Sequence, residues 1–318
     1  MILSITLNPC IDHALFVDEL KPHDSNRVVR VERDAGGKGI NLSRVVAELG
    51  GTSVATGLLG GGTGNYIRHV LDQQGAVHRF LQIDGETRVN FSVEDETDQP
   101  PTSFNERGPN ISREELDEFR RLLPELVYAA RWIAVGGSMP PGVPKEFYAE
   151  LVGFARANGI KILVDADGEA MVHALGARPD LVKPNADEAS RLLGRDIDTL
   201  DQAVDAVQEL RTRMKRESVA TPIAIISRGD KGAVLACAEG VFNGLPPKVD
   251  VRSTIGSGDS LLGGFLWALE EGRSIEDAFR LGIACGAATA TTSGSEIARR
   301  PVIEAVLPGV RVERLVAP

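Results

Sequence analysis

After Pro109 the chain alternates between amphipathic helical segments and short segments that are apolar throughout. A segment that is apolar at every position, such as residues 132–135, predicts a strand covered on both faces. Helices between such strands bring the strands parallel and cover the two faces of their sheet. The alternation therefore predicts an α/β protein with three α/β/α layers around a central, mainly parallel sheet. The predicted strands include 2–7, 52–59, 132–135, 160–165, 181–182 and 221–227, and the predicted helices include 65–74, 111–126, 145–158 and 274–292.

Two stretches interrupt this alternation with strand-like patterns. Residues 28–31 resemble an exposed strand, and in residues 88–93 polar side chains such as Arg88 and Asn90 alternate with apolar ones. Because both stretches adjoin glycine-rich segments, we predict that they pair directly in one small sheet that acts as a lid. The alternative is a solvent-facing sheet without a role in binding. The predicted division is a core of residues 1–11, 35–85 and 107–318 and a lid of residues 12–34 and 86–106.

Residues 253–272 predict a glycine turn that opens a buried helix. The free N–H groups at a helix start attract anions, and Gly256 and Gly258 leave room for a ligand to reach them. Asp259 is a carboxylate in the same turn, where it would repel a phosphate unless it handles a proton. This combination is typical of phosphoryl transfer, with Asp259 as the general base. The alternative is that Asp259 only complements the helix dipole.

A second glycine turn, A-G-G-K-G-I-N at residues 35–41, also opens a helix. It offers backbone N–H groups, the Lys38 ammonium and the Asn41 amide to a polar ligand, although a structural turn with a solvated lysine is the alternative. Asp12 follows the first strand, where open parallel sheets bind ligands, but it could also be a turn residue after proline. We interpret the glycines of residues 60–64 as a tight connection. The Walker and dinucleotide patterns are both absent, so a nucleotide would be held in another way.

The chain has 318 residues and a formal net charge of −10, without a basic run. This composition argues against nucleic acid as a partner. Cys10, Cys237 and Cys285 are scattered without metal-ligand spacing, which predicts thiols in a reducing compartment. No apolar run reaches membrane-spanning length, and the apolar start of the chain lacks the basic leader of a signal peptide. We therefore expect a cytoplasmic protein without a membrane partner.

A set of motifs runs in one order over essentially the whole chain: T-L-N-P-C-I-D, N-R-V, A-G-G-K-G-I-N, G-E-T-R-V-N, N-E-R-G-P, G-S-M-P-P-G-V-P, V-K-P-N-A-D-E and S-T-I-G-S-G-D-S. Together they resemble the ribokinase-like sugar kinases of the phosphofructokinase B branch, especially the 1-phosphofructokinases and tagatose-6-phosphate kinases. The departures are Met139 where Leu is usual, Ser257 where Ala is commoner and Arg107 where Pro is frequent. Ser257 occurs in some tagatose-6-phosphate kinases, whereas T-S-F-N-E-R-G-P is closer to the 1-phosphofructokinases, so the sub-family stays open.

The resemblance implies an ATP- and magnesium-dependent kinase in which Asp259 is the catalytic base and Gly256, Ser257 and Gly258 form the anion hole. The residues implied for the acceptor, including three cations for its phosphate, are Asp12, Arg27, Gly37, Lys38, Asn41, Arg88, Asn90 and Ser138. The residues implied for ATP are Lys183, Asn185, Ser227, Gly229, Gly232, Thr254, Gly256 and Gly258. The resemblance places Glu188 near magnesium, but Asn185 and Glu188 also fit the N-cap and N3 positions of a helix, which the residues alone favour.

The implied reaction is the ATP-dependent phosphorylation of a phosphorylated ketohexose, foremost fructose 1-phosphate to fructose 1,6-bisphosphate. Tagatose 6-phosphate and fructose 6-phosphate are the alternative acceptors. A protein of another class, a non-catalytic sugar-phosphate sensor, would not need Asp259 beside an anion hole. The family dimerises through its lids, and an exposed lid edge strand is a physical reason to expect a homodimer.

Overall fold

The computed structural model describes residues 1–95, 102–215 and 222–317. Within these residues one large sheet has the strands β1 (Ile2–Thr6), β4 (Ser53–Gly60), β5 (Leu81–Ile83), β8 (Trp132–Gly136), β9 (Lys161–Asp165), β10 (Leu181–Val182), β11 (Ile223–Ser227), β12 (Ala233–Cys237), β13 (Gly240–Leu245) and β14 (Arg311–Val316). Their order is β14-β13-β12-β11-β10-β9-β8-β1-β4-β5. The pairs from β11 to β5 are parallel, and those from β11 to β14 are antiparallel. The sheet is therefore mainly parallel, as predicted.

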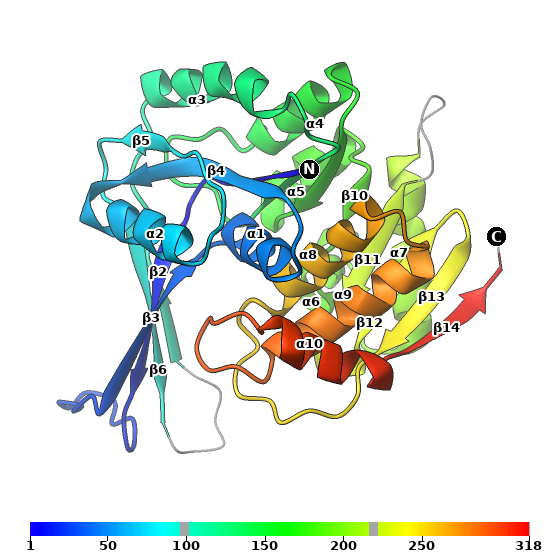
Figure 1. The fold of residues 1–318 in the computed structure, drawn as a ribbon. Helices are drawn as coiled ribbons and strands as arrows, with labels where there is room; N and C mark the ends of the chain where they lie inside the picture. The colour runs from blue at the N-terminus through cyan, green and yellow to red at the C-terminus, as the bar shows by residue number, and fades with distance from the viewer. Residues whose placement is uncertain (96–101, 216–221, 318) are drawn as a thin grey trace.

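Helices cover both faces of this sheet and complete the three predicted layers (Figure 1). One face packs against α3 (Arg113–Leu126), α4 (Phe147–Ala157), α5 (Gly168–Gly176), α6 (Ala186–Leu193) and α7 (Leu200–Met214). The other face packs against α1 (Lys38–Glu48), α8 (Ser257–Glu270), α9 (Ile275–Thr289) and α10 (Arg300–Val306), with α2 (Gly61–Gln73) beside the base of the second sheet. None of the described helices combines the length and hydropathy needed to cross a membrane.

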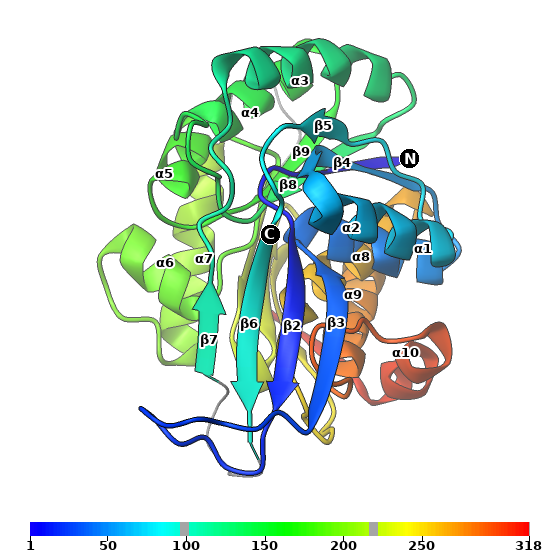
Figure 2. The same ribbon diagram turned by 90° about the vertical axis from the view of Figure 1, so that its left-hand side faces the viewer.

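A second sheet projects from the core, as Figure 2 shows. Its strands are β2 (Cys10–Phe16), β3 (Arg30–Gly36), β6 (Arg88–Glu94) and β7 (Thr102–Asn105), in the order β3-β2-β6-β7. The predicted direct pairing of residues 88–93 with residues 28–31 is wrong. The strand β2, which the sequence analysis did not predict, lies between them and pairs with β6 in parallel. We call this four-stranded sheet the lid. Its first chain segment, from the start of β2 to the end of β3, extends two residues beyond the predicted range 12–34 at each end.

The helix α2 also differs from expectation, because it begins at Gly61, within residues 60–64, for which the sequence predicts a tight connection. Glycine has a low helix propensity, but the free N–H groups of this first turn have a partner from elsewhere. The Glu86 carboxylate accepts hydrogen bonds from the backbone N–H groups of Gly62 and Thr63. The side chain of Thr63, together with these backbone N–H groups, lowers the pKa of Glu86. The bonds also connect the start of α2 to the segment that enters β6.

Candidate active site

The helix α8 begins directly after Gly256, whose φ of 76° lies in the left-handed region that favours glycine. Asp259 lies in the first turn and is 9% exposed. Its Oδ2 accepts a hydrogen bond of 2.9 Å from Asn41 Nδ2 of α1. Burial raises the pKa of Asp259 to about 6, against the opposing effect of the Lys38 charge. Asp259 is therefore ionised at neutral pH and still basic enough to accept a proton, as a general base requires.

The residues predicted for the acceptor gather where the lid joins the core, and we call this group the acceptor half. Asp12 of β2 and Asn90 of β6 are register partners, and Asn90 Nδ2 donates to Asp12 Oδ1 at 3.1 Å. The Oδ1 of Asn90 is buried without a hydrogen-bond partner among the described residues. Gly37, with a φ of 124°, packs against Thr6 and leads into α1, which carries Asn41. Gly37 thus leads through α1 and Asn41 to Asp259, whereas Asp12 and Asn90 belong to the lid.

Arg88 extends this acceptor half. Its Nε donates to the Asn8 carbonyl at 3.2 Å, and its Nη1 donates to the Glu106 carbonyl at 2.8 Å. Asn8 in turn donates to Ser138 Oγ at 3.1 Å, which places the predicted residue Ser138 in the same neighbourhood. Within the described part of the chain Arg88 has no carboxylate partner, so its guanidinium keeps its charge available for an anion.

Arg27 is not brought to this neighbourhood. It lies exposed in the connection between β2 and β3, before the end of β3 that pairs with Phe16. Asp12 lies four residues before Phe16 on β2, closer to the core. The structure therefore groups Arg88 with the acceptor residues and leaves Arg27 toward the outer end of the lid.

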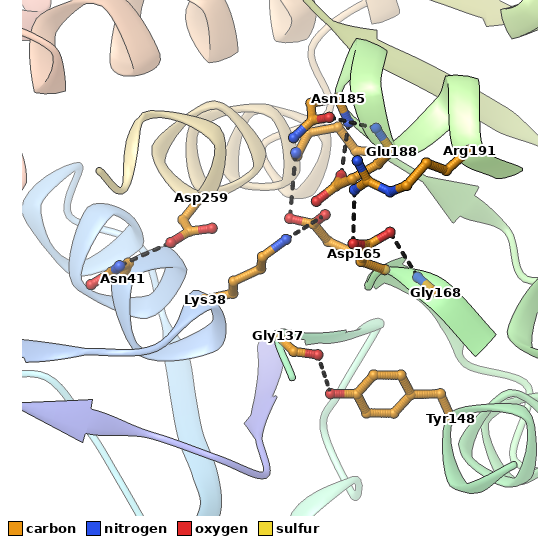
Figure 3. Close-up of polar contacts among 12 residues, drawn as sticks. Lys38, Asn41, Gly137, Tyr148, Asp165, Gly168, Asn185, Glu188, Arg191 and Asp259 are labelled. Atoms are coloured by element: carbon orange, nitrogen blue, oxygen red, sulfur yellow. Dashed lines mark hydrogen bonds and ion pairs between the residues drawn. The ribbon is translucent and has the colours of Figure 1, made fainter. Parts of the chain in front are cut away.

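Lys38 lies between the acceptor and nucleotide halves, with no described contact to Arg88. Its Nζ donates to Asp165 Oδ1 at 3.0 Å (Figure 3). Lys183 Nζ lies 3.4 Å from Asp165 Oδ2. Asp165 ends β9 and is 1% exposed. Sequence reasoning did not assign Asp165 to the site, although its place at the carboxyl end of a parallel strand is a signal that could have done so.

A cavity of about 1270 Å³ reaches from Lys38 and Asp259 to the antiparallel side of the large sheet, and we call it the nucleotide half because the residues predicted for ATP line it. Its lining includes apolar side chains such as Ile283 and Ala287 of α9. The Oγ of Ser257 is buried beside it without a hydrogen-bond partner among the described residues. All of the residues predicted for ATP and the anion hole line this cavity: Lys183, Asn185, Ser227, Gly229, Gly232, Thr254, Gly256, Ser257 and Gly258.

Glu188 also lines this cavity, and it forms the capping box that the residues favoured. The Asn185 backbone N–H donates to Glu188 Oε2 at 2.8 Å, and the Glu188 backbone N–H donates to Asn185 Oδ1 at 2.8 Å. The Oε1 of Glu188 makes no hydrogen bond among the described residues. In the same part of the chain, no group of three His, Cys, Asp or Glu side chains could hold a metal ion alone.

A buried base at an anion-binding helix start, between an acceptor site and a nucleotide-sized cavity, defines a phosphotransferase that acts on a small molecule. Comparison with known proteins makes this class specific. The chain belongs to the pfkB family carbohydrate kinases, whose family model matches residues 4–301. It is therefore a kinase that phosphorylates an alcohol group of a carbohydrate, with ATP as the donor that the sugar kinase family implies. The family and the reaction class predicted from the sequence are confirmed.

Individual relatives cover nearly the whole chain. The 1-phosphofructokinase of Borreliella burgdorferi is 34% identical over 91% of this chain and 92% of its own length. The 1-phosphofructokinase of Bacillus subtilis is 32% identical over 99% of this chain and 100% of its own length. Among solved structures, phosphofructokinase-2 from Escherichia coli in complex with substrates and products superposes with a TM-score of 0.89 at 29% identity, covering 96% of this chain and 98% of that one.

Proposed function

We propose that this kinase transfers the γ-phosphoryl group of ATP to fructose 1-phosphate and forms fructose 1,6-bisphosphate. The observation that carries the proposal is the acceptor half, in which the Arg88 guanidinium lies near the polar pair Asp12 and Asn90 without a carboxylate of its own. Arginine binds phosphate through two parallel hydrogen bonds, so an acceptor that already carries a phosphate fits this half. The names of the two relatives with about one-third identity support the same acceptor.

The proposed reaction uses Asp259 as the base. The hydroxyl on carbon 6 of the acceptor gives its proton to Asp259 as the hydroxyl oxygen bonds to the γ-phosphorus of ATP. The bond between that phosphorus and the β–γ bridging oxygen breaks, and ADP leaves with the electron pair. The N–H groups at the start of α8 stabilise the charge on the transferring oxygens. Asn41 holds the Asp259 carboxylate in place through its hydrogen bond.

We also propose that magnesium binds with ATP beside Glu188. Magnesium usually binds proteins through one or two carboxylates together with substrate phosphates. Glu188 fits this requirement, because its Oε1 is free of hydrogen bonds among the described residues and it lines the cavity. The bound ion would neutralise part of the negative charge of the phosphates.

A panel of acceptors tests the proposal with the purified protein. We expect the kcat/KM measured by ADP release to be higher for fructose 1-phosphate than for tagatose 6-phosphate or fructose 6-phosphate, and much higher than for free fructose. A preference for another phosphosugar would change the acceptor but keep the kinase. Equal use of free fructose would contradict the phosphosugar assignment, and binding of sugar phosphate without any transfer would favour a sensor.

The lid is the surface through which we propose that the chain forms a homodimer. It exposes apolar side chains on several strands and turns, including Val29, which is 63% exposed, and Phe104, which is 59% exposed. Exposed apolar side chains on an open sheet edge favour association with a second sheet.

Sedimentation velocity of Val29→Glu tests this dimer. We expect the dissociation constant to rise at least about tenfold, because a buried group without a polar partner costs about 1–3 kcal/mol and a charge costs more. The matched control is Val172→Glu on α5, where an apolar side chain of 55% exposure lies away from the lid. A wild-type protein that sediments as a monomer, or a dimer that Val29→Glu leaves intact, would contradict the lid interface.

A cytoplasmic location is proposed on the evidence of the cysteines. Cys10, Cys237 and Cys285 are buried, free thiols. Such thiols are typical of proteins in a reducing compartment.

A further inference from the structure

The Asp165 carboxylate has no part in the reaction proposed above, yet it lies among the charged groups of the site. Its Oδ1 accepts a hydrogen bond of 3.0 Å from Lys38 Nζ. Its Oδ2 lies 3.4 Å from Lys183 Nζ, which is close enough for an ion pair. That contact lacks the geometry of a hydrogen bond, so Oδ2 is a buried oxygen without a hydrogen-bond partner among the described residues. One buried carboxylate therefore faces two ammonium groups.

The two lysines reach Asp165 from different elements of the fold. Lys38 is the first residue of α1 and follows Gly37 of the acceptor half. Lys183 follows β10 on the nucleotide side, and a Cβ placed on Gly258 would lie 3.2 Å from its Nζ. The Lys183 ammonium is therefore in contact with the anion hole. Burial lowers the pKa of Lys38, but Asp165 and Asp259 outweigh this effect and raise the pKa above its ordinary value, so Lys38 stays charged.

We propose that Asp165 is a positioning residue that holds the Lys38 and Lys183 ammonium groups on opposite sides of the phosphoryl group as it passes from ATP to the acceptor. This inference rests on the proposed kinase function. Lysine is a point charge on a flexible stem, so a fixed carboxylate between two lysines orders them before the substrates bind. Lys38 donates to Oδ1 at 3.0 Å and Lys183 lies 3.4 Å from Oδ2, so each oxygen of the carboxylate faces one ammonium group.

The charges of the cluster explain why a carboxylate suits this position. The positive charges of Lys38 and Lys183 balance the negative charges of Asp165 and Asp259. When Asp259 takes the proton of the acceptor, the cluster gains one net positive charge beside the moving phosphoryl group. A cluster without Asp165 would carry a net positive charge before the reaction and would bind ATP more tightly in the ground state. Tighter binding of the ground state does not lower the activation barrier.

The substitution Asp165→Asn tests the proposal, because it keeps the shape of the side chain and removes its charge. We expect kcat to fall roughly 10²-fold, the scale of a small misplacement of catalytic groups. The KM for ATP should not rise. In a Lys38→Ala background the same substitution should cost markedly less, because residues that act through one another are not additive. The matched control is Asp167→Asn, two residues further along, whose carboxylate instead pairs with Arg191 at the surface and should leave kcat unchanged.

Two further measurements separate positioning from other roles. The magnesium concentration that gives half-maximal rate should be the same in Asp165→Asn and wild type. A shift of about tenfold in this concentration, together with additive effects of Asp165→Asn and Lys38→Ala on kcat, would make Asp165 a metal ligand and overturn the proposal. A crystal structure of Asp165→Asn needs no turnover and should show at least one ammonium group displaced. Both ammonium groups in place with kcat unchanged would also overturn it. A failure of the kinase function itself would instead appear in the wild type, with every acceptor.

Discussion

Replacing Asp259 with asparagine is expected to lower kcat by about 10²–10⁴-fold, the usual contribution of a general base. The amide oxygen of the new side chain can still accept the hydrogen bond from Asn41 Nδ2, so the shape of the site is kept and only the proton acceptor is lost. The affinities for ATP and acceptor should change little. Turnover is measured by ADP release, and substrate binding by calorimetry.

The pH profile distinguishes a base from a carboxylate that only complements the helix dipole. A base acts in its ionised form, so the wild-type kcat/KM should fall about tenfold per pH unit as the pH drops below the Asp259 pKa of about 6. The residual activity of Asp259→Asn should lack this acid limb. As a control, Asp277→Asn removes a first-turn carboxylate from the neighbouring helix α9. This variant should keep the wild-type turnover and the acid limb of the pH profile. Near-wild-type turnover in Asp259→Asn would exclude the base role.

Arg88→Ala is expected to lower kcat/KM for fructose 1-phosphate by about 10- to 150-fold, which corresponds to the 1.5–3 kcal/mol of a hydrogen bond to a charged group. The two backbone carbonyls that accept from Arg88 hold its guanidinium in a fixed orientation before the acceptor arrives. The KM for ATP should stay near wild type, because Arg88 does not line the nucleotide cavity.

The acceptor without a phosphate is the internal control for this substitution. Arg88→Ala should leave kcat/KM for free fructose unchanged. The ratio of kcat/KM for fructose 1-phosphate to that for free fructose should therefore fall by the same factor as kcat/KM for fructose 1-phosphate. Arg33→Ala removes another arginine of the lid, on β3, and should leave both acceptors unaffected. Equal losses with both acceptors would indicate that Arg88 stabilises the lid and does not bind the phosphate.

Local patterns predicted the parts of the molecule that depend on neighbouring residues in the chain. The turn at Gly256 and the start of α8 place Asp259 at an anion site whatever packs around them. The capping box of Asn185 and Glu188 is equally local. The start of α2 could not be predicted in this way, because the partner of its free N–H groups is Glu86, which is distant in the sequence.

The same limit applies to the charged cluster. The role of Lys38 depends on which carboxylate its long side chain meets, and that carboxylate, Asp165, belongs to a strand more than a hundred residues away. The strand β2 was missed because its sequence, C-I-D-H-A-L-F, has no clear alternation, and it becomes a strand by pairing on both sides, with β3 and β6. Tertiary pairing thus decided what local propensity left open.

Two short excursions from the core build the sheet that carries Asp12, Arg88 and Asn90, whereas the residues around the nucleotide cavity belong to the core sheet and its helices. The lid residues proposed for the sugar phosphate thus lie on chain segments separate from those that line the nucleotide cavity. Under the proposed roles, substitutions in these lid segments alter contacts with the acceptor and leave the residues that line the nucleotide cavity unchanged.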